Sequence, residues 1–450
     1  MKKFIKYIAY ILLPVLFIIG CTDLDETVYT QMPIDKYGQT TTEINSLIAP
    51  IYTGLRSANN PSYIAELSSD MAIVLTYKGG DGWDGGIYKE LRYGTWTPQN
   101  SIIEDLYDFS PISRCNQILY MIETSPAIID KAPYTSQVRA VRAFWYYQLV
   151  DLYGNVPIVT DFTDLSKPAT KTRKEVYEFI MSELNAIKDV IRSDVSTSSY
   201  GKFTKGAVYT LLAKMYLNAM VWNPTGGAKW QECIDACNVV LGLPYSLEPV
   251  WKDNFITYNE KCKETILTAV NSPSKGNNIV RKTLHYLDPI ALGIKRSTWN
   301  EISAMPDYVR QFDLDDKRRG GDEVHTTGSF LIGPMINPAT GNVLITAHGR
   351  PLIHTIDITM KYNIDADGWG QAEQEEGARC YKWEFINGLS TDLENDCAIF
   401  RLADVYLMKA EALVRMGGDN VEATRLVNEI RKRAFTDPAK LKTSVTLDDI

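Results

Sequence analysis

Apolar residues recur at helical spacing over residues 400–435. The first set comprises Leu402, Val405, Tyr406, Met408, Ala410, Leu413 and Val414. Gly417 and Gly418 follow, and glycine provides the positive-φ exit that ends such a helix. Asp419 or Asn420 can cap a second helix, whose apolar stripe is Val421, Ala423, Leu426, Val427 and Ile430. The pattern therefore predicts an antiparallel helix pair joined by a short turn.

Two earlier segments share the pattern of the first of these helices. RAFWYYQLVDLYG from Arg142, KGAVYTLLAKMYL from Lys205 and RLADVYLMKAEAL from Arg401 each place a small residue before an aromatic one and an apolar face. The small residues are Ala143, Gly206 and Ala403, and the aromatic ones are Tyr146, Tyr209 and Tyr406. A small residue allows a neighbouring helix to approach closely, which is typical of tetratricopeptide-type stacks. Three unrelated amphipathic helices are the alternative interpretation.

The rest of the chain divides into a helical part and an irregular part. Periodicity and turn residues predict one helix after Asn45, a second after Pro61, and others at 101–124, 134–153, 172–192, 204–221 and 228–241. Residues 243–398 are rich in Gly, Pro and Asn, with strand-like pieces at 265–270, 343–347 and 351–356. We therefore expect a mainly α fold in which 22–242 carries helix pairs, 243–398 is an irregular insertion and 399–435 is the last pair. Binding residues are often placed on loops inserted into such a rigid frame.

Composition narrows the possible partners. The 450 residues are 45% hydrophobic and 23% charged, which is typical of a globular chain with a large core. The net charge is −8 and no basic cluster exceeds a solvated helix face, so we expect no nucleic-acid partner. Nine Trp and 26 Tyr are more informative, because their flat faces and polar tips suit surfaces that contact amphipathic ligands.

The N-terminus has the features of an export signal. Lys2, Lys3 and Lys6 precede an apolar run that ends at Gly20, and Cys21 follows. Ile18-Ile19-Gly20-Cys21 resembles a bacterial lipobox, so 1–20 is the expected signal peptide, 21–450 a single domain and Cys21 the lipidated residue. The run is short for a membrane span, so the protein is expected to be anchored by lipid rather than to cross the bilayer. A signal peptide cleaved elsewhere, giving a freely secreted protein, is the alternative.

Cysteine and metal-like patterns add little chemistry. The other six cysteines contain no C-x-x-C pair, which argues against a disulfide framework, and Cys233 and Cys237 are expected to be buried thiols on a helix. Asn363, Asp365 and Asp367 followed by Gly368 match the first positions of a calcium loop. The twelfth position is Gln374 instead of Glu, so a polar turn without metal is the preferred interpretation, with calcium as the alternative.

A glycine-rich segment at 79–86, GGDGWDGG, holds Trp83 in a loop, and Trp96 follows shortly after it. A phosphate-binding loop would require a following Lys-Ser/Thr and a strand leading into a helix, and neither is present. The irregular region supplies further aromatic candidates at Tyr286, Trp299, Tyr308, Phe312 and Trp369.

Taken together, these segments resemble the SusD/RagB family of outer-membrane nutrient-uptake lipoproteins. The resemblance rests on CTDLDE at 21–26, GGDGWDGG at 79–86, TWTP at 95–98, RAVRAFWYYQLVDLYGNVPIVT at 139–160, FDLDDKR at 312–318, GARCYKWEF at 377–385, NDCAIFRLADVYLMKAEALVR at 395–415 and VNEIRKRAF at 427–435. It implies a scaffold of four tetratricopeptide-like helix pairs, an oligosaccharide-binding face, and a complex with a SusC-type TonB-dependent transporter. It also implies a location on the outer face of the outer membrane. Members of the family continue past the equivalent of Ile450 into a further helix, so we expect this protein to continue as well.

The expected chemistry is capture of a glycan without catalysis or a cofactor. Sugar rings have apolar C–H faces that stack on Trp and Tyr, while Asn, Asp and Arg pair with the hydroxyl groups. The candidate platforms are Trp83, Trp96, Trp299 and Tyr286, and the candidate polar partners are Asp81, Arg92 and Asn100. For each Trp, packing in the core is the alternative.

Two other functions are weighed against this one. A glycoside hydrolase could use paired carboxylates such as Asp81 and Asp84, but loop-turn aspartates are the simpler explanation, and His285, His325, His348 and His354 form no catalytic motif. A tetratricopeptide-type stack could instead bind peptide or protein in a concave groove.

Overall fold

The computed structural model describes residues 38, 40–77, 87–126, 128–273, 276, 278–320, 328–359, 372–388, 390 and 392–450. Helices dominate, and the strands are short, as the sequence predicts. The helices are α2 (Thr41–Thr53), α3 (Asn60–Leu67), α4 (Ile87–Tyr93), α5 (Ser101–Leu106), α6 (Ser110–Thr124), α7 (Ala132–Tyr153), α8 (Arg173–Ile187), α9 (Lys205–Leu217), α10 (Ala219–Trp222), α11 (Trp230–Leu241), α12 (Ile279–Thr283), α13 (Asp288–Leu292), α14 (Pro306–Arg310), α15 (Leu402–Arg415) and α16 (Asn420–Ala434).

Local sequence explains where several of these helices begin and end. The side chain of Thr172 accepts a hydrogen bond from the backbone N–H of Glu175, and the Glu175 carboxylate accepts one from the Thr172 N–H, forming a capping box at the start of α8. Helix α16 begins at the predicted cap, because the Asp419 side chain accepts from the N–H of Glu422. Gly417 has a φ of 64°, so the predicted glycine exit after α15 is confirmed.

The predicted continuous helix at 101–124 is wrong, because the chain forms α5 and α6 with a break at 107–109. Pro111 has no N–H to donate to the carbonyl of Tyr107. In addition, Asp108 accepts a hydrogen bond from the N–H of Ser110, which starts a new helix instead of extending the old one. The predicted strand at 343–347 is also wrong, since Val343 and Ile345 make only isolated bridges.

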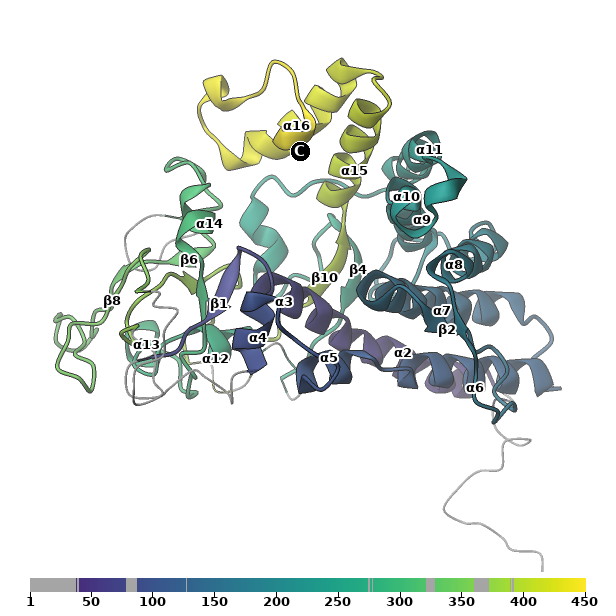
Figure 1. Cartoon of the computed structure of the whole chain (residues 1–450), viewed down its shortest axis with the longest axis horizontal. Helices are drawn as coiled ribbons and strands as arrows, with labels where there is room; N and C mark the ends of the chain where they lie inside the picture. The colour runs from purple at the N-terminus through teal and green to yellow at the C-terminus, as the bar shows by residue number, and fades with distance from the viewer. Residues whose placement is uncertain are drawn as a thin grey trace, which may run out of the picture.

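Seven helices pack side by side as a helix stack, defined here as α6, α7, α8, α9, α11, α15 and α16. Figure 1 shows this stack on the right and at the top. Helix α11 ends at Leu241 and α15 begins at Leu402, yet α11 packs directly against both α9 and α15. The C-terminal helix pair therefore extends the stack begun by the N-terminal part of the chain.

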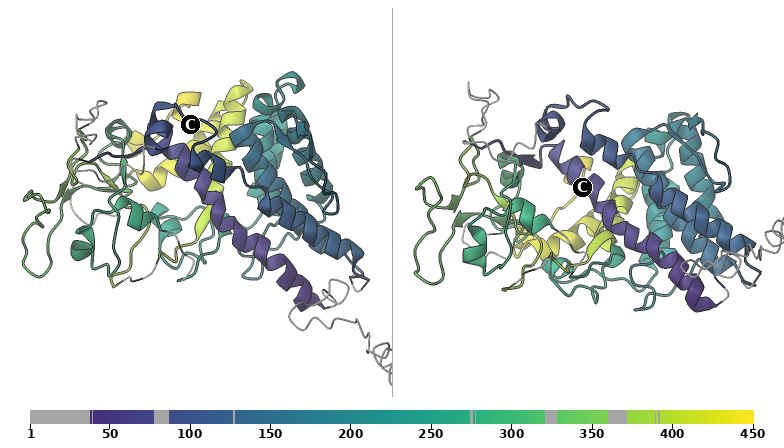
Figure 2. Two further views of the ribbon diagram at one scale, coloured as in Figure 1. Left: turned by 60° about the horizontal axis from the view of Figure 1, so that its bottom comes forward. Right: turned by 90° about the horizontal axis from the view of Figure 1, so that it is seen from below.

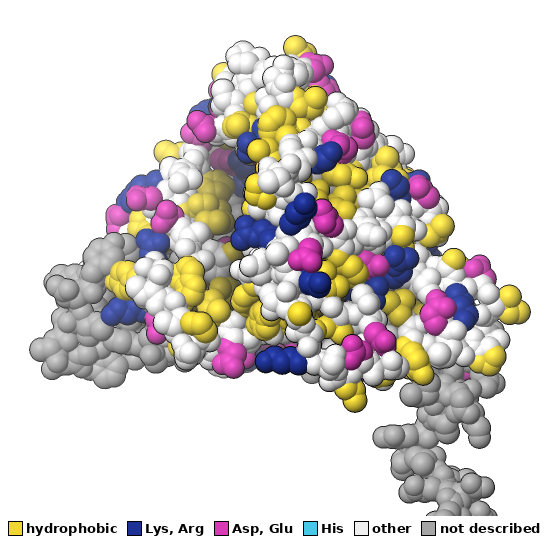
Figure 3. Space-filling model, turned by 45° about the vertical axis from the view of Figure 1, so that its right-hand side comes forward, with side chains coloured by type: hydrophobic (Ala, Val, Ile, Leu, Met, Phe, Trp, Pro, Cys, Tyr) yellow, Lys and Arg dark blue, Asp and Glu magenta, His cyan; other side chains and the backbone are white. Residues whose placement is uncertain are grey.

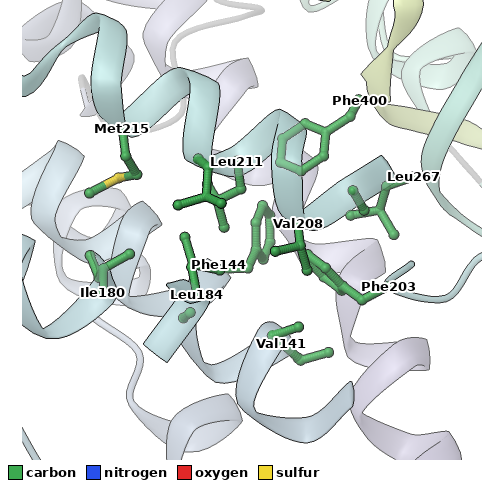
Figure 4. Packing of buried hydrophobic residues seen from close by; sticks show 14 of the residues in the cluster. Val141, Phe144, Ile180, Leu184, Phe203, Val208, Leu211, Met215, Leu267 and Phe400 are labelled. Carbon is green, nitrogen blue, oxygen red and sulfur yellow. The ribbon is translucent and has the colours of Figure 1, made fainter. Parts of the chain in front are cut away.

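The core of the stack is built from helices and strands that lie far apart in sequence. Phe144 of α7 lies with its ring centroid 5.9 Å from that of Phe203 and 6.0 Å from that of Phe400, and all three side chains are buried. Val208 and Leu211 of α9 fill the space around them (Figure 4). Close packing of this kind ties α7, α9 and the segment before α15 into one unit.

Residues 243–398, called here the loop-rich region, carry short helices and most of the strands. The strand pairs are antiparallel: β1 (Ala72–Val74) with β5 (Ile302–Ala304), β2 (Val156–Pro157) with β3 (Thr170–Lys171), β4 (Thr265–Ala269) with β10 (Cys397–Arg401), β6 (Phe330–Leu331) with β9 (Arg379–Cys380), and β7 (Gly333–Pro334) with β8 (Ile353–His354). Figure 2 shows that the loop-rich region lies beside the helix stack in both views. Strand β10 leads directly into α15, so the β4–β10 pair joins the two parts.

Charged side chains of both signs are interspersed over the face shown in Figure 3, and this face has no extended patch of a single sign. Within the described ranges, every helix is too short or too polar to cross a lipid bilayer. The cysteines of the described chain are free thiols, and Cys233 and Cys237 are buried on α11, as predicted.

Candidate functional site

Two of the predicted aromatic platforms, Tyr286 and Trp299, lie on segments that are hydrogen-bonded to each other. The backbone N–H of Trp299 donates to the carbonyl of Arg281, and the N–H of Asn300 donates to the carbonyl of Leu284 at 2.9 Å. The hydroxyl of Thr298 donates to the carbonyl of His285 at 2.7 Å. The residue before Trp299 is thus joined directly to the residue before Tyr286.

Both rings reach the surface. Trp299 is 40% exposed and Tyr286 is 39% exposed, so neither side chain is packed in the core. The guanidinium of Arg281 lies 4.3 Å from the centroid of the Trp299 ring, within the range of a cation–π contact. Arg281 therefore lies against the indole, which still keeps part of its surface exposed.

A buried polar framework supports Trp299 from below. Asn300 has a φ of 53°, a conformation that asparagine tolerates better than most residues, and its side chain donates to the carbonyl of Gln374 at 3.0 Å. The fully buried Arg379 donates to the same carbonyl at 2.7 Å and to the hydroxyls of Tyr77 and Ser303. These hydrogen bonds hold the buried side of the loop that contains Asn300, so the backbone that carries the Trp299 indole is fixed.

Trp96 lies on the connection between α4 and α5. It is 45% exposed, and its ring lies over Gly94, whose φ of 64° makes the turn after α4. Leu91 of α4 and Ile302 of β5 belong to one small apolar cluster, which also includes Ala72 of β1. This cluster joins the elements that carry Trp96 and Trp299 (Figure 1).

The two polar candidates near Trp96 have partners inside the protein. Asn100 is buried and caps α5: its side-chain oxygen accepts from the N–H of Ile102, and its amide nitrogen donates to Ile87 and Glu90. Arg92 donates to the carbonyl of Ser69 and the carboxylate of Asp70. Both side chains therefore shape the α4–α5 corner instead of presenting free donors to a ligand.

Several predicted residues lie outside the described part of the chain. These are the platform Trp83 with its neighbours Asp81 and Asp84, the lipidation candidate Cys21, and Asn363, Asp365 and Asp367 of the calcium-like turn. Among the described residues, no group of three or more His, Cys, Asp or Glu side chains is arranged to hold a metal ion.

Sequence reasoning did not identify Arg281, Thr298 and Asn300 as parts of this surface. Arg281 and Trp299 are separated by 17 residues of irregular chain, so no helical or strand periodicity relates them. The one local signal was Asn300, because asparagine adopts the left-handed conformation more readily than most residues.

The fold is a tetratricopeptide-like helix stack, and loops beside it carry the exposed rings of Trp96, Tyr286 and Trp299. A model of the SusD family matches residues 360–450, and a second family model, described as "Starch-binding associating with outer membrane", matches residues 24–217. Both models describe SusD-type families, so the chain is similar to the SusD family over these two ranges.

Comparison with individual proteins agrees with this family. The starch-binding protein SusD of Bacteroides thetaiotaomicron is 27% identical over 327 residues, which cover 66% of this chain and 57% of that protein's length. The surface glycan-binding protein A of the same species, solved in complex with laminarihexaose, superimposes with a TM-score of 0.68 at 19% identity, covering 91% of this chain and 85% of the other. A SusD superfamily protein from Parabacteroides distasonis gives a TM-score of 0.69 at 19% identity, with 88% and 81% covered. At this level of identity, the structural similarity defines the fold alone.

Proposed function

We propose that this protein captures glycans at the cell surface and delivers them to a SusC-type TonB-dependent transporter in the outer membrane. The observation that carries the proposal is the exposed pair Tyr286 and Trp299, held on two segments that are bonded to each other. Trp96 is proposed to extend the same surface, and Trp83 and Asp81, which lie outside the described residues, remain candidate ligand contacts. Arg92 and Asn100 are proposed to act indirectly, by holding the corner that carries Trp96.

Stacking on these rings suits a sugar better than a peptide. The flat faces of exposed aromatic rings match the C–H faces of pyranose rings, and both surfaces lose water when they meet. The names of the relatives, a starch-binding protein and a protein in complex with laminarihexaose, support a glucan as the first ligand to test. Binding requires only capture and release, so no cofactor and no reacting residue is proposed.

Affinity electrophoresis in gels that contain soluble starch or laminarin tests this proposal. We expect the wild-type protein to be retarded, and Trp299→Ala and Trp96→Ala to weaken binding about tenfold each, or about 1.4 kcal/mol. Tyr120→Ala is the matched control, because Tyr120 is equally exposed but lies on α6 of the helix stack. Circular dichroism verifies that each variant is folded.

The same gels also show which face of the protein holds the glycan. Tyr120 and Phe162 form an exposed aromatic contact with ring centroids 6.0 Å apart, at the helix stack. Retardation that depends on Tyr120 and not on Trp299 would move the binding face to the stack and overturn the proposed site. If both Trp variants are retarded as strongly as wild type, the proposed site is also overturned. The same conclusion follows if no member of a broad polysaccharide panel retards the wild-type protein.

The proposed anchor and transporter are tested separately. Labelling of cells with a fatty acid should mark the wild-type protein and not a Cys21→Ser variant. Solubilised outer membranes should then yield a TonB-dependent transporter that co-purifies with the tagged protein. Release of unlabelled protein into the medium would contradict the lipid anchor.

A further inference from the structure

A fully buried pair of titratable side chains lies next to the segments that carry Tyr286 and Trp299. Asp288, the first residue of α13, and His354 of β8 both lack measurable solvent exposure at their side chains. The Nε2 atom of His354 lies 2.9 Å and 3.1 Å from the two carboxylate oxygens of Asp288. The two residues are 66 positions apart in the sequence, and α13 and β8 meet through this contact.

The partners of His354 determine its protonation. Its Nδ1 atom lies 3.1 Å from the backbone carbonyl of Glu375, which can only accept a hydrogen bond. Its Nε2 atom faces the Asp288 carboxylate, which also accepts when ionised. Nδ1 therefore carries a proton, and Nε2 shares a hydrogen bond with the carboxyl group of Asp288. Burial acts to raise the pKa of Asp288, but His354, His285 and Arg379 together outweigh burial and hold this pKa below the ordinary value.

His285 makes a different set of hydrogen bonds from His354. Its Nδ1 accepts from the N–H of Leu287 at 3.1 Å, so the proton of the neutral ring is on Nε2. Burial lowers the pKa of His285 to about 4, and the nearby positive charges of Arg379 and His354 act in the same direction. Asp288 is thus the acidic side chain that faces His354, His285 and Arg379 in this interior.

A chain of hydrogen bonds leads from Asp288 to the residues directly before the two rings. Asp288 accepts from the backbone N–H of His285 at 2.7 Å, which fixes the turn that carries Tyr286. The carbonyl of His285 accepts from the hydroxyl of Thr298, the residue before Trp299. Each link is short, and Asp288, His285 and Thr298 are buried, so water does not compete for these bonds.

We propose that Asp288 and His354 are the positioning residues of the aromatic site: the hydrogen bond between them fixes the His285 turn and, through Thr298, sets the orientation of Trp299 relative to Tyr286. The inference rests on the proposed function for its meaning, because a fixed spacing of two rings matters only if a rigid ligand stacks on both. The structural part of the proposal is that Asp288 and His354 set the orientation of the Trp299 indole. This part can be tested without any ligand.

Substitutions of His354 separate positioning from general stability. The amide nitrogen of a glutamine reaches the place of Nε2, whereas that of an asparagine reaches the place of Nδ1. His354→Gln therefore keeps a donor for Asp288, and His354→Asn keeps only the donor for Glu375. Both variants remove the imidazole ring, so a merely structural role of that ring would affect them alike.

Thr298→Val provides a milder variant that removes the single bond to His285 and keeps the side-chain shape. Thr268→Val is the matched control, since the buried hydroxyl of Thr268 in β4 has no hydrogen-bond partner. If His354→Asn does not fold, Thr298→Val decides the question by itself.

The main measurement is ¹⁹F NMR of protein labelled with 5-fluorotryptophan, with the Trp299 signal assigned by Trp299→Phe. We expect His354→Asn and Thr298→Val to shift or broaden the Trp299 signal, and His354→Gln and Thr268→Val to leave it in place. An unchanged Trp299 signal in both His354→Asn and Thr298→Val would overturn the positioning role.

Glycan gels with starch and laminarin add the functional readout. We expect binding about tenfold weaker in His354→Asn, or about 1.4 kcal/mol, and about threefold weaker in Thr298→Val, as for the loss of one neutral hydrogen bond. If Trp299→Ala abolishes retardation but these two variants bind like wild type, the positioning inference fails and the proposed function stands. If no variant or wild-type protein is retarded, the proposed function fails, and the NMR result still decides whether Asp288 and His354 orient the ring.

Discussion

Arg433 of α16 forms a buried ion pair with Glu264, directly before β4, with Nη2 of the arginine 3.0 Å from Oε1 of the glutamate. The Glu264 side chain has no solvent exposure, and Arg401 donates to the same oxygen at 2.8 Å. One carboxylate therefore ties the C-terminal helix pair to the strand pair β4–β10. This contact joins the helix stack to the loop-rich region that carries the candidate site.

Replacing Glu264 by glutamine should destabilise the protein strongly. The substitution keeps the shape but leaves two guanidinium groups without their counter-charge, which costs about 3–5 kcal/mol for a broken buried pair. Urea unfolding followed by circular dichroism measures the loss. Glu411→Gln is the control, because Glu411 pairs with Arg415 on the exposed face of α15 and should cost less than about 0.5 kcal/mol. Equal costs for the two variants would contradict the proposed importance of the Glu264 cluster.

The Glu264 cluster also predicts a pH dependence of stability. Burial acts to raise the pKa of Glu264, but the hydrogen bond from Arg433 and the charge of Arg401 outweigh burial and hold the pKa below its ordinary value. A glutamate in the unfolded chain has a pKa of about 4.3. The stabilisation is therefore complete above that pH and is lost as the pH falls through the lower pKa of the folded state. We expect the difference in unfolding free energy between wild type and Glu264→Gln to shrink below about pH 4.3; a difference that stays constant would refute this assignment.

Gly206 of α9 is a small residue required by a neighbouring ring. A Cβ atom at this position would lie 2.6 Å from the hydroxyl and 2.8 Å from a ring carbon of Tyr245. Gly206→Ala should therefore lower the unfolding free energy by about 1–3 kcal/mol through overpacking. In a Tyr245→Ala background the same substitution should cost nothing, which a double-mutant cycle measures directly.

Gly242→Ala serves as the control for Gly206→Ala. Gly242 has a φ of −82°, and an added Cβ would meet only ordinary contacts beyond 3.4 Å, so we expect a change within about 0.5 kcal/mol. A Gly206→Ala cost that persists without the Tyr245 ring would show that helix α9 itself, and not the ring contact, requires glycine.

Arg281 should be sensitive to a change that keeps its charge. Its planar guanidinium stacks on Trp299, a geometry that a lysine ammonium does not reproduce. Arg281→Lys should weaken glycan retardation by about three- to fivefold, as expected for a cation–π contact of about 0.5–1 kcal/mol. Arg296→Lys is the control, since Arg296 pairs with Asp392 in the same region. Unchanged retardation in Arg281→Lys would show that the stack does not orient the indole.

The sequence by itself determined the local elements of this protein. The apolar spacing of 402–414, the glycine at Gly417 and the cap at Asp419 specified α15 and α16, because helix formation depends on neighbours within one or two turns. The family segments likewise identified a helix-pair scaffold. The break before α6 was also encoded locally, in Asp108 and Pro111, although the apolar periodicity alone concealed it.

Only the tertiary structure decided which distant residues meet. The packing of α11 on α15, the pairing of Glu264 with Arg433 and the contact of His354 with Asp288 all join segments with no shared periodicity. For the same reason, the sequence did not decide which side chains are exposed. Trp96 and Trp299 lie at the surface, whereas Asn100 is buried as the N-cap of α5. Whether a side chain is exposed depends on what packs over it, and that is set by close packing of the whole chain instead of by its neighbours in sequence.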